Sequence, residues 1–143
     1  MNSDPADLIP SKHRILVVDD DASAREMVTR VLAGEGYSVW QAADGATALN
    51  MCRTVQFDLA LLDLNLPGGE GLKTYETLAG KNPSLPVIIM TARSKQNTRT
   101  PINGGAAVIE KPLDFSRLLQ TVSRVLAEHD GTESKLKPAT RPK

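Results

Sequence analysis

Side chains that can bind metal or phosphate stand at the ends of four short apolar runs in this sequence. A pair of acids, a single acid, a hydroxyl and an ammonium group follow these runs, at Asp19, Asp20, Asp63, Thr91 and Lys111. Carboxylates that lie close together repel one another, and one of them takes up a proton unless a cation lies between them. Oxygen ligands of this kind suit Mg²⁺, which usually keeps open positions for phosphate oxygens. The set therefore predicts a site for Mg²⁺ and phosphate.

The same set can support phosphoryl transfer. An ammonium group and a hydroxyl donor can stabilise the charge on the phosphoryl oxygens as the group is transferred. A carboxylate can itself accept the phosphoryl group and become an aspartyl phosphate. Asp63 is the best-placed acceptor, because the apolar run before it is expected to form a central strand.

The elements that position these residues follow from the spacing of apolar residues. Short apolar runs predict buried strands at 15–18, 59–62, 87–90 and 106–109, and the first of these runs is largely β-branched. A weaker strand is expected at 38–42. Between most of them, apolar residues recur at helical spacing, around 24–32, 44–52, 70–79 and 115–126. Strands that alternate with helices predict an α/β fold, a doubly wound parallel sheet covered on both faces. Ligands bind beyond the carboxyl ends of such strands, so these side chains should meet at one edge.

Local signals indicate where helices begin and where one is interrupted. Asp21, Asp44 and Asp114 each precede a helical pattern, and their carboxylates are expected to cap the first turn. The stretch 94–105 has a helical rhythm, but Pro101 and two glycines interrupt it. We expect a weak or short helix there.

Composition restricts the partners and the compartment. The 17 Lys and Arg residues balance 17 Asp and Glu residues, and a formal net charge of zero does not indicate a surface for nucleic acid or anionic membrane. Cys52 is the only cysteine, which excludes an internal disulfide and a cysteine zinc cage, and its place on an apolar helix face predicts a core position. No apolar run approaches the roughly 20 residues of a membrane span, and the first residues do not resemble a signal peptide. We therefore expect a cytoplasmic chain that contacts neither nucleic acid nor membrane directly.

The chain is expected to hold one domain between two flexible ends. Residues 1–13 are polar and form a flexible lead, whereas 14–128 contain all the predicted strands and helices. Residues 129–143 are polar, contain two prolines and have no apolar face, which predicts a disordered tail or a truncated linker.

Four motifs together carry a family resemblance over about 14–128. They are Ile15-Leu16-Val17-Val18-Asp19-Asp20, Leu62-Asp63-Leu64-Asn65-Leu66-Pro67-Gly68, Met90-Thr91-Ala92 and Lys111-Pro112. With these motifs in this order, the chain resembles the receiver domain of two-component response regulators. The resemblance implies a (βα)5 fold with the flavodoxin-like strand order 2-1-3-4-5. It also implies a signalling switch that catalyses only its own phosphoryl transfer and dephosphorylation.

The resemblance assigns roles to the acidic residues. Asp63 would accept a phosphoryl group from a sensor histidine kinase or a phosphotransfer protein. The Mg²⁺ ligands would be Asp20, Asp63 and the backbone carbonyl of Asn65, with Asp19 assisting through water. The Asn65 side chain would stand where the family tunes dephosphorylation.

It assigns further roles beyond the third strand. Thr91 and Lys111 would bind the phosphoryl oxygens, and the peptide before Pro112 would be cis. Arg93 would stand at a second position where the family tunes dephosphorylation. Val108 stands where the family usually has an aromatic switch residue, so an aromatic switch is not expected. A downstream protein would bind the face around the fourth helix and fifth strand, and the chain would be a monomer or a weak, phosphorylation-linked dimer.

Two other interpretations are open at this stage. A pseudo-receiver would keep the fold as an interaction module without phosphorylation. Val108 and the weak fourth helix leave this interpretation open, whereas the retained site residues argue against it, namely Asp19, Asp20, Asp63, Thr91 and Lys111. A phosphohydrolase of the haloacid dehalogenase type also places an Asp after a strand. That family has an acid two residues after its nucleophile, where this chain has Asn65, so the hydrolase is the weaker alternative.

Overall fold

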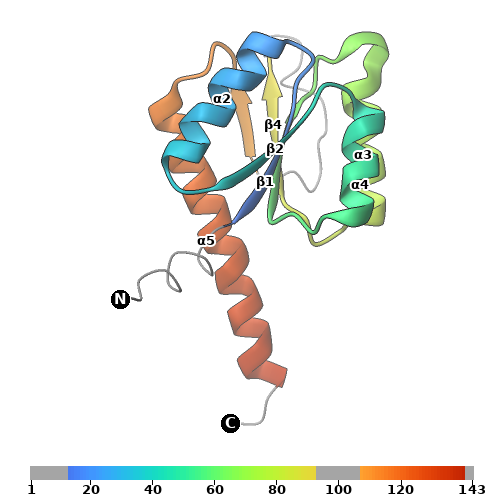
Figure 1. Ribbon diagram of the computed structural model, residues 1–143. Helices are drawn as coiled ribbons and strands as arrows, with labels where there is room; N and C mark the ends of the chain where they lie inside the picture. Colours follow the sequence, from blue (N-terminus) through green and yellow to red (C-terminus); the bar gives the residue numbers. More distant parts are fainter. Residues whose placement is uncertain (1–12, 93–106, 141–143) are drawn as a thin grey trace.

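The computed structural model describes residues 13–92 and 107–140, in which strands and helices alternate (Figure 1). The strands are β1 (Arg14–Val18), β2 (Ser38–Ala42), β3 (Leu59–Asp63), β4 (Val87–Thr91) and β5 (Ala107–Glu110). The helices are α2 (Ala22–Gly34), α3 (Gly45–Thr54), the 3-10 turn η1 (Pro67–Gly69), α4 (Glu70–Lys81) and α5 (Phe115–Thr140). Neighbouring strands are parallel, in the order β2-β1-β3-β4-β5. The predicted α/β fold and strand order are confirmed.

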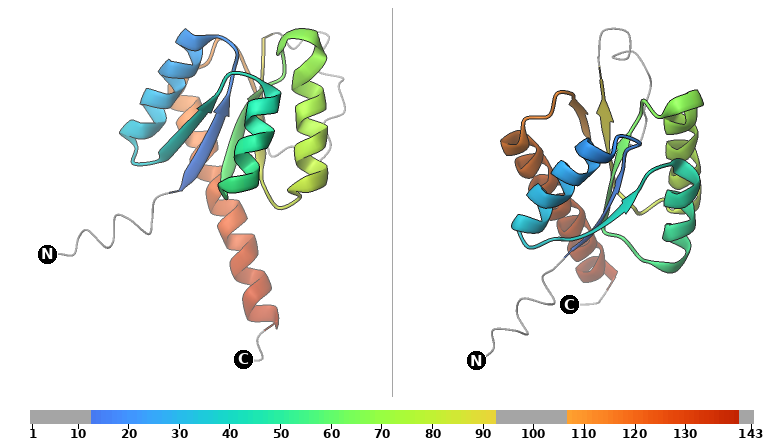
Figure 2. Two further views of the ribbon diagram at one scale, coloured as in Figure 1. Left: turned by 45° about the vertical axis from the view of Figure 1, so that its right-hand side comes forward. Right: turned by 45° about the horizontal axis from the view of Figure 1, so that its top comes forward.

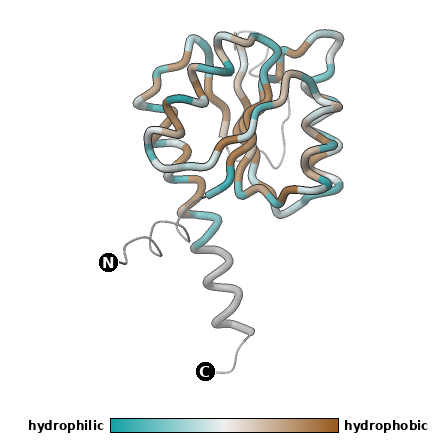
Figure 3. Tube along the Cα trace, viewed as in Figure 1, coloured by the Kyte–Doolittle hydropathy of each residue, from teal (hydrophilic) through white to brown (hydrophobic). Residues whose placement is uncertain are grey.

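The sheet separates two apolar cores. Ile15 and Val17 of β1 pack in one core with residues of α2 and α5, whereas Leu16 and Val18 pack in the other with residues of α3 and α4. This alternation follows from the period of two along a strand. Figure 1 and both views of Figure 2 show α2 and α5 on one face of the sheet and α3 and α4 on the other. Figure 3 shows the hydrophobic colour concentrated along the strands between them.

The predicted helix caps are confirmed. The Asp21 carboxylate accepts two backbone N–H groups from the first turn of α2, at 3.0 and 3.3 Å. Asp44 accepts one from α3 at 2.7 Å, and Asp114 accepts two from α5 at 3.0 and 3.2 Å. The predicted core position of Cys52 is also consistent with the structure, because this partly buried side chain packs against the second core.

The last helix ends later than the sequence indicated. Among the residues of α5 whose burial is described, up to Asp130, the last buried one is Leu126, and a tail was expected from His129, but α5 continues to Thr140. A helix that has already formed adds one backbone hydrogen bond for each further residue, so it can continue without an apolar face. In Figures 1 and 2 this end of α5 projects beyond the sheet.

The expected weak helix at 94–105 and Arg93 lie outside the described residues. Within those residues, no helix has the length and hydrophobicity needed to cross a membrane.

Candidate functional site

Three carboxylates meet at the carboxyl edge of the sheet. Asp19 follows β1, and its N–H donates to the carbonyl of Ala42 at 3.1 Å. Asp63 is the last residue of the neighbouring strand β3. One carboxylate oxygen from each of Asp19, Asp20 and Asp63 lies within 4.8 Å of the others. Asp19 and Asp63 are buried and Asp20 is exposed, so the cluster has an inner pair and an outer acid.

Lys111 lies between the two inner carboxylates. Its Nζ donates to Asp19 Oδ2 and to Asp63 Oδ2, both at 3.1 Å. Its backbone N–H donates to the carbonyl of Thr91 at 2.7 Å, which fixes the end of β5 against the end of β4. The peptide between Lys111 and Pro112 is cis. Four strands that are distant in the sequence thus contribute to one cluster.

Burial and charge oppose each other in this cluster. Burial raises the pKa of the Asp63 carboxyl, while the N–H of Asn65 and the ammonium of Lys111 act in the opposite direction. Burial also disfavours the charge on Lys111, but the hydrogen bond to Asp63 and the charge of Asp19 outweigh it and raise the pKa of that ammonium. Lys111 is therefore a fixed positive charge against the acids.

Asn65 ties the loop after β3 to the end of β4. Its backbone N–H donates to Asp63 Oδ1 at 2.8 Å. Its side-chain oxygen accepts the N–H of Ala92 at 2.7 Å and lies 3.5 Å from the hydroxyl oxygen of Thr91. Thr91 is buried at the end of β4. This one residue therefore orients the Asp63 carboxylate and links it to the strand that carries Thr91.

A glycine allows α4 to approach the same loop. A Cβ added to Gly71 would overlap the backbone carbonyl group of Leu64, the residue between Asp63 and Asn65. A Cβ at Gly80, near the other end of α4, would meet nothing within 4 Å. The close packing of helix and loop is thus specific to the end of α4 at the site.

The structure brings together most of the residues that the sequence singled out. Asp19, Asp20, Asp63 and Lys111 form the cluster, and Thr91 lies beside Asn65. Val108 on β5 is 57% exposed. Arg93 lies outside the described residues.

Sequence reasoning did not find Arg25. From the first turn of α2, its Nη1 donates to the backbone carbonyl of Asp19 at 2.7 Å, and its Nε donates to Gln41 Oε1 at 3.0 Å. In the sequence Arg25 is one of the polar residues of the helical pattern at 24–32, and a contact with a backbone carbonyl cannot be predicted from residue types. The side-chain contacts of Asn65 were missed for a similar reason, because they depend on the path of a loop.

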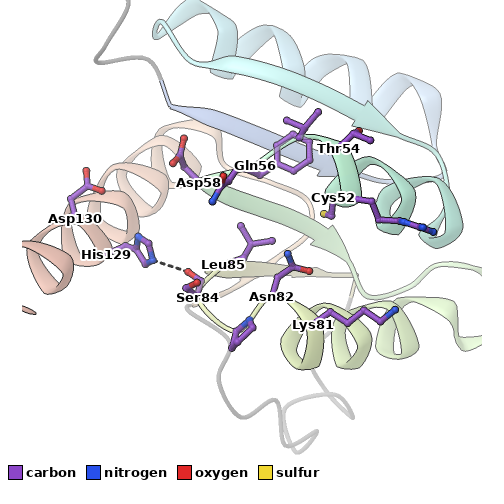
Figure 4. A pocket seen from close by; sticks show the side chains of 14 residues that line it. Cys52, Thr54, Gln56, Asp58, Lys81, Asn82, Ser84, Leu85, His129 and Asp130 are labelled. Atoms are coloured by element: carbon purple, nitrogen blue, oxygen red, sulfur yellow. Dashed lines mark hydrogen bonds between the residues drawn. The ribbon is translucent and has the colours of Figure 1, made fainter.

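A separate cavity lies at the opposite, amino edge of the sheet. It has a volume of about 540 Å³ and is lined by the loops after α3 and α4 and by residues of α5. Figure 4 shows Asp58, Ser84 and His129 around it, and the His129 ring donates from Nε2 to the carbonyl of Ser84 at 2.7 Å. No residue of the acidic cluster lines this cavity.

The acidic cluster fits a divalent cation. Two buried carboxylates and one exposed carboxylate offer oxygen ligands at close range, and among the described residues only the Lys111 ammonium forms an ion pair with them. Mg²⁺ is commonly held by one or two carboxylates together with water and phosphate oxygens. A doubly wound sheet with this cluster at its carboxyl edge defines the class of phosphoacceptor signalling domains.

Comparisons with known proteins agree with this class. The family model "Response regulator receiver domain" matches residues 15–123. The transcriptional regulatory protein ZraR of Salmonella typhimurium is 37% identical over 135 residues, which are 93% of this chain and 31% of that protein. The chain thus spans about a third of the length of this relative.

Solved structures give the same result. A CheY-like receiver domain protein from Methanospirillum hungatei has a TM-score of 0.79 and 33% identity, over 85% of this chain and 99% of that chain. TrrA from Thermotoga maritima, solved in complex with Mg²⁺-BeF, has a TM-score of 0.73 and 30% identity, over 79% of this chain and 98% of that chain. The chain belongs to the response regulator receiver domain family, whose members are phosphoacceptor switches of two-component phosphorelays and bind Mg²⁺ at their acidic site.

Proposed function

We propose that Asp63 is the phosphoacceptor of this receiver and takes its phosphoryl group from a sensor histidine kinase or a phosphotransfer protein. The observation that carries the proposal is the way this carboxylate is held. Asp63 Oδ2 accepts from Lys111 Nζ at 3.1 Å, and Oδ1 accepts from the N–H of Asn65 at 2.8 Å. A buried carboxylate that is oriented at both oxygens is suited to attack an incoming phosphorus atom.

The phosphoryl transfer needs only the donor imidazole and the groups at this site. An Asp63 oxygen attacks the phosphorus atom, the bond from phosphorus to the donor imidazole nitrogen breaks, and the imidazole keeps the electron pair. Lys111 stabilises the charge on the phosphoryl oxygens, and the hydroxyl of Thr91 donates to one of them. Hydrolysis of the aspartyl phosphate by water later restores the carboxylate.

The proposed Mg²⁺ ligands are Asp20, Asp63 and the backbone carbonyl of Asn65, with Asp19 acting through a water molecule. Mg²⁺ supplies charge neutralisation between the acids and the phosphoryl oxygens when it is bound. Asp19 keeps Lys111 in place, since its Oδ2 accepts from the same ammonium as Asp63. Asn65 and Arg93 are the positions that would tune dephosphorylation.

The signal would leave through the face that contains β5. Val108 is exposed there, so we propose contact with a downstream protein and not an aromatic switch. We also propose a cytoplasmic chain that acts on no separate substrate and makes no direct contact with nucleic acid or membrane through residues 14–128. The oligomeric state that fits this role is a monomer or a weak dimer linked to phosphorylation.

The test is incubation with acetyl phosphate and Mg²⁺, followed by intact mass measurement of the wild type and the Asp63→Asn variant. We expect one phosphoryl adduct on the wild type and none on the variant. Asp44→Asn is the matched control, because it removes an exposed acid that caps α3 and should keep the adduct.

Other outcomes would point to the alternatives. A wild type without adduct at any Mg²⁺ concentration would indicate a pseudo-receiver. Continuous turnover of phosphoesters would indicate a phosphohydrolase.

A further inference from the structure

We propose that Arg25 is a positioning residue for the acidic cluster, which sets the Asp19–Asp20 segment for Mg²⁺ by holding the backbone carbonyl of Asp19. The inference rests on the part of the proposed function that gives Mg²⁺ to this cluster. It does not depend on whether Asp63 is phosphorylated. The main observation is the 2.7 Å hydrogen bond from Arg25 Nη1 to the backbone carbonyl oxygen of Asp19.

Asp19 is held by contacts from several directions. Its N–H donates to Ala42 in β2, its Oδ1 accepts the N–H of Asp21 at 2.9 Å, and its Oδ2 accepts from Lys111. Arg25 provides the remaining contact, at the carbonyl oxygen. Each polar group of Asp19 thus has a partner, and within the described part of the chain Arg25 alone acts on the carbonyl of the peptide that leads to Asp20.

That peptide decides where Asp20 points. A peptide unit is planar, so holding the carbonyl oxygen of Asp19 also fixes the nitrogen and the Cα of the next residue. Asp20 is exposed, and its carboxylate therefore depends on its own backbone for direction. Arg25 can in this way place the outer acid of the cluster without touching it.

The second contact of Arg25 makes the first one rigid. Its Nε donates to the Gln41 side chain of β2 at 3.0 Å, so the guanidinium joins the start of α2, the end of β1 and β2. A planar guanidinium held at two nitrogens has a fixed orientation, which a lysine ammonium cannot reproduce.

The place of Arg25 on its helix supports a role at the site. A positive charge in the first turn of a helix is unfavourable with respect to the helix dipole. Arg25 lies there, since its N–H donates to the carbonyl of the capping residue Asp21 at 2.9 Å. Helix stability therefore does not explain an arginine at this position, whereas the contacts with Asp19 and Gln41 do.

The experiment measures the Mg²⁺ dissociation constant of the full chain by isothermal titration calorimetry. Arg25→Ala should weaken binding about tenfold, the low end of the effect seen when partners of metal ligands are removed. Arg25→Lys should bind Mg²⁺ nearly as weakly as Arg25→Ala, because it keeps the charge but loses the planar guanidinium that donates from two nitrogens. Arg30→Ala is the control, since it removes an exposed charge from the same helix, and it should stay within about twofold of the wild type.

A second variant separates positioning from folding. Gln41→Leu should weaken Mg²⁺ binding in the same direction but less, and the double variant with Arg25→Ala should bind no more weakly than Arg25→Ala alone. Urea unfolding in EDTA should show that the variants are folded at the temperature of the titration.

Three results would overturn the proposal. They are Mg²⁺ binding by Arg25→Ala within twofold of the wild type, full rescue by Arg25→Lys, and a wild type that binds no Mg²⁺. Failure of Asp63 to form an adduct, with Mg²⁺ binding intact, would contradict the phosphoacceptor role and leave the role of Arg25 standing.

Discussion

Burial favours the protonated form of the Asp63 carboxyl, whereas its hydrogen bonds with Asn65 and Lys111 favour the charged form. Burial raises the pKa of this carboxyl, so the folded protein binds more protons than the unfolded chain between the ordinary aspartate pKa and the raised one. Stability contributed by the protonated form is complete below the ordinary value, near pH 4, and is lost as the pH rises through the raised pKa. The charge that the proposed chemistry needs therefore lowers the stability of the unphosphorylated domain.

The Asp63→Asn variant should consequently be more stable than the wild type at neutral pH without Mg²⁺. We expect a gain on the order of 1 kcal/mol in the free energy of unfolding, which shrinks toward zero as the pH falls to about 4. Urea unfolding in EDTA, followed across this pH range through the near-UV signal of Trp40, measures the difference.

The control variant Asp44→Asn should change the pH dependence of stability in the opposite direction. The N–H of Thr47 lowers the pKa of Asp44, so the stability that this carboxylate contributes is present above the ordinary aspartate pKa and is lost as the pH falls through the lowered value. Asp44→Asn should remove that dependence. A constant difference between Asp63→Asn and the wild type at all pH values would contradict the prediction.

The residues of the cluster differ in how far the sequence reveals them. Asp19, Asp63 and Lys111 could be predicted to meet, because each follows an apolar run and the ends of parallel strands share one edge. Arg25 could not, because its contact depends on the rotation of α2 relative to the end of β1.

At the scale of elements, Gly71 sets the distance between α4 and the loop after β3. Gly71→Ala would force its Cβ into the backbone of Leu64, and backbone cannot move aside as a flexible side chain can. We expect a loss of about 1–3 kcal/mol in the free energy of unfolding. Mg²⁺ binding should weaken as well, because Asn65 lies in the displaced loop.

Gly80→Ala is the matched control on the same helix. A Cβ there meets nothing within 4 Å, and alanine is the better helix former, so stability should rise by up to about 1 kcal/mol. Equal effects of the two substitutions would show that the packing at Gly71 is unimportant.

The elements were predicted with unequal success for physical reasons. Apolar runs and capping acids are local signals, and they gave β2 at Ser38–Ala42 and the caps at Asp21, Asp44 and Asp114. The end of α5 was not predicted, because the apolar stripe records where a helix is packed and not where its backbone hydrogen bonds stop.

At the scale of the whole molecule, α5 connects the two edges of the sheet. It begins after the loop that holds Lys111 at the carboxyl edge, and it passes the amino edge at His129, whose ring donates to the carbonyl of Ser84. Its buried residues lie between these points and are Leu118, Val122, Val125 and Leu126. The C-terminal part of α5 projects beyond the sheet (Figure 1).

Truncation of α5 should therefore have two different effects. A chain that ends at Asp130 keeps every residue of α5 that is described as buried, and it keeps the hydrogen bond between His13 Nε2 and Asp130 Oδ2 at 3.2 Å. Its free energy of unfolding should stay within about 0.5 kcal/mol of the full chain, as for changes at exposed sites. The free energy of unfolding of a chain that ends at Arg124, which loses Val125 and Leu126, should fall by at least about 2 kcal/mol.

Urea unfolding of the full chain and both truncations measures these differences, and Mg²⁺ binding by the longer truncation should equal that of the full chain. A loss above about 1 kcal/mol in the longer truncation would show that residues 131–143 stabilise the domain.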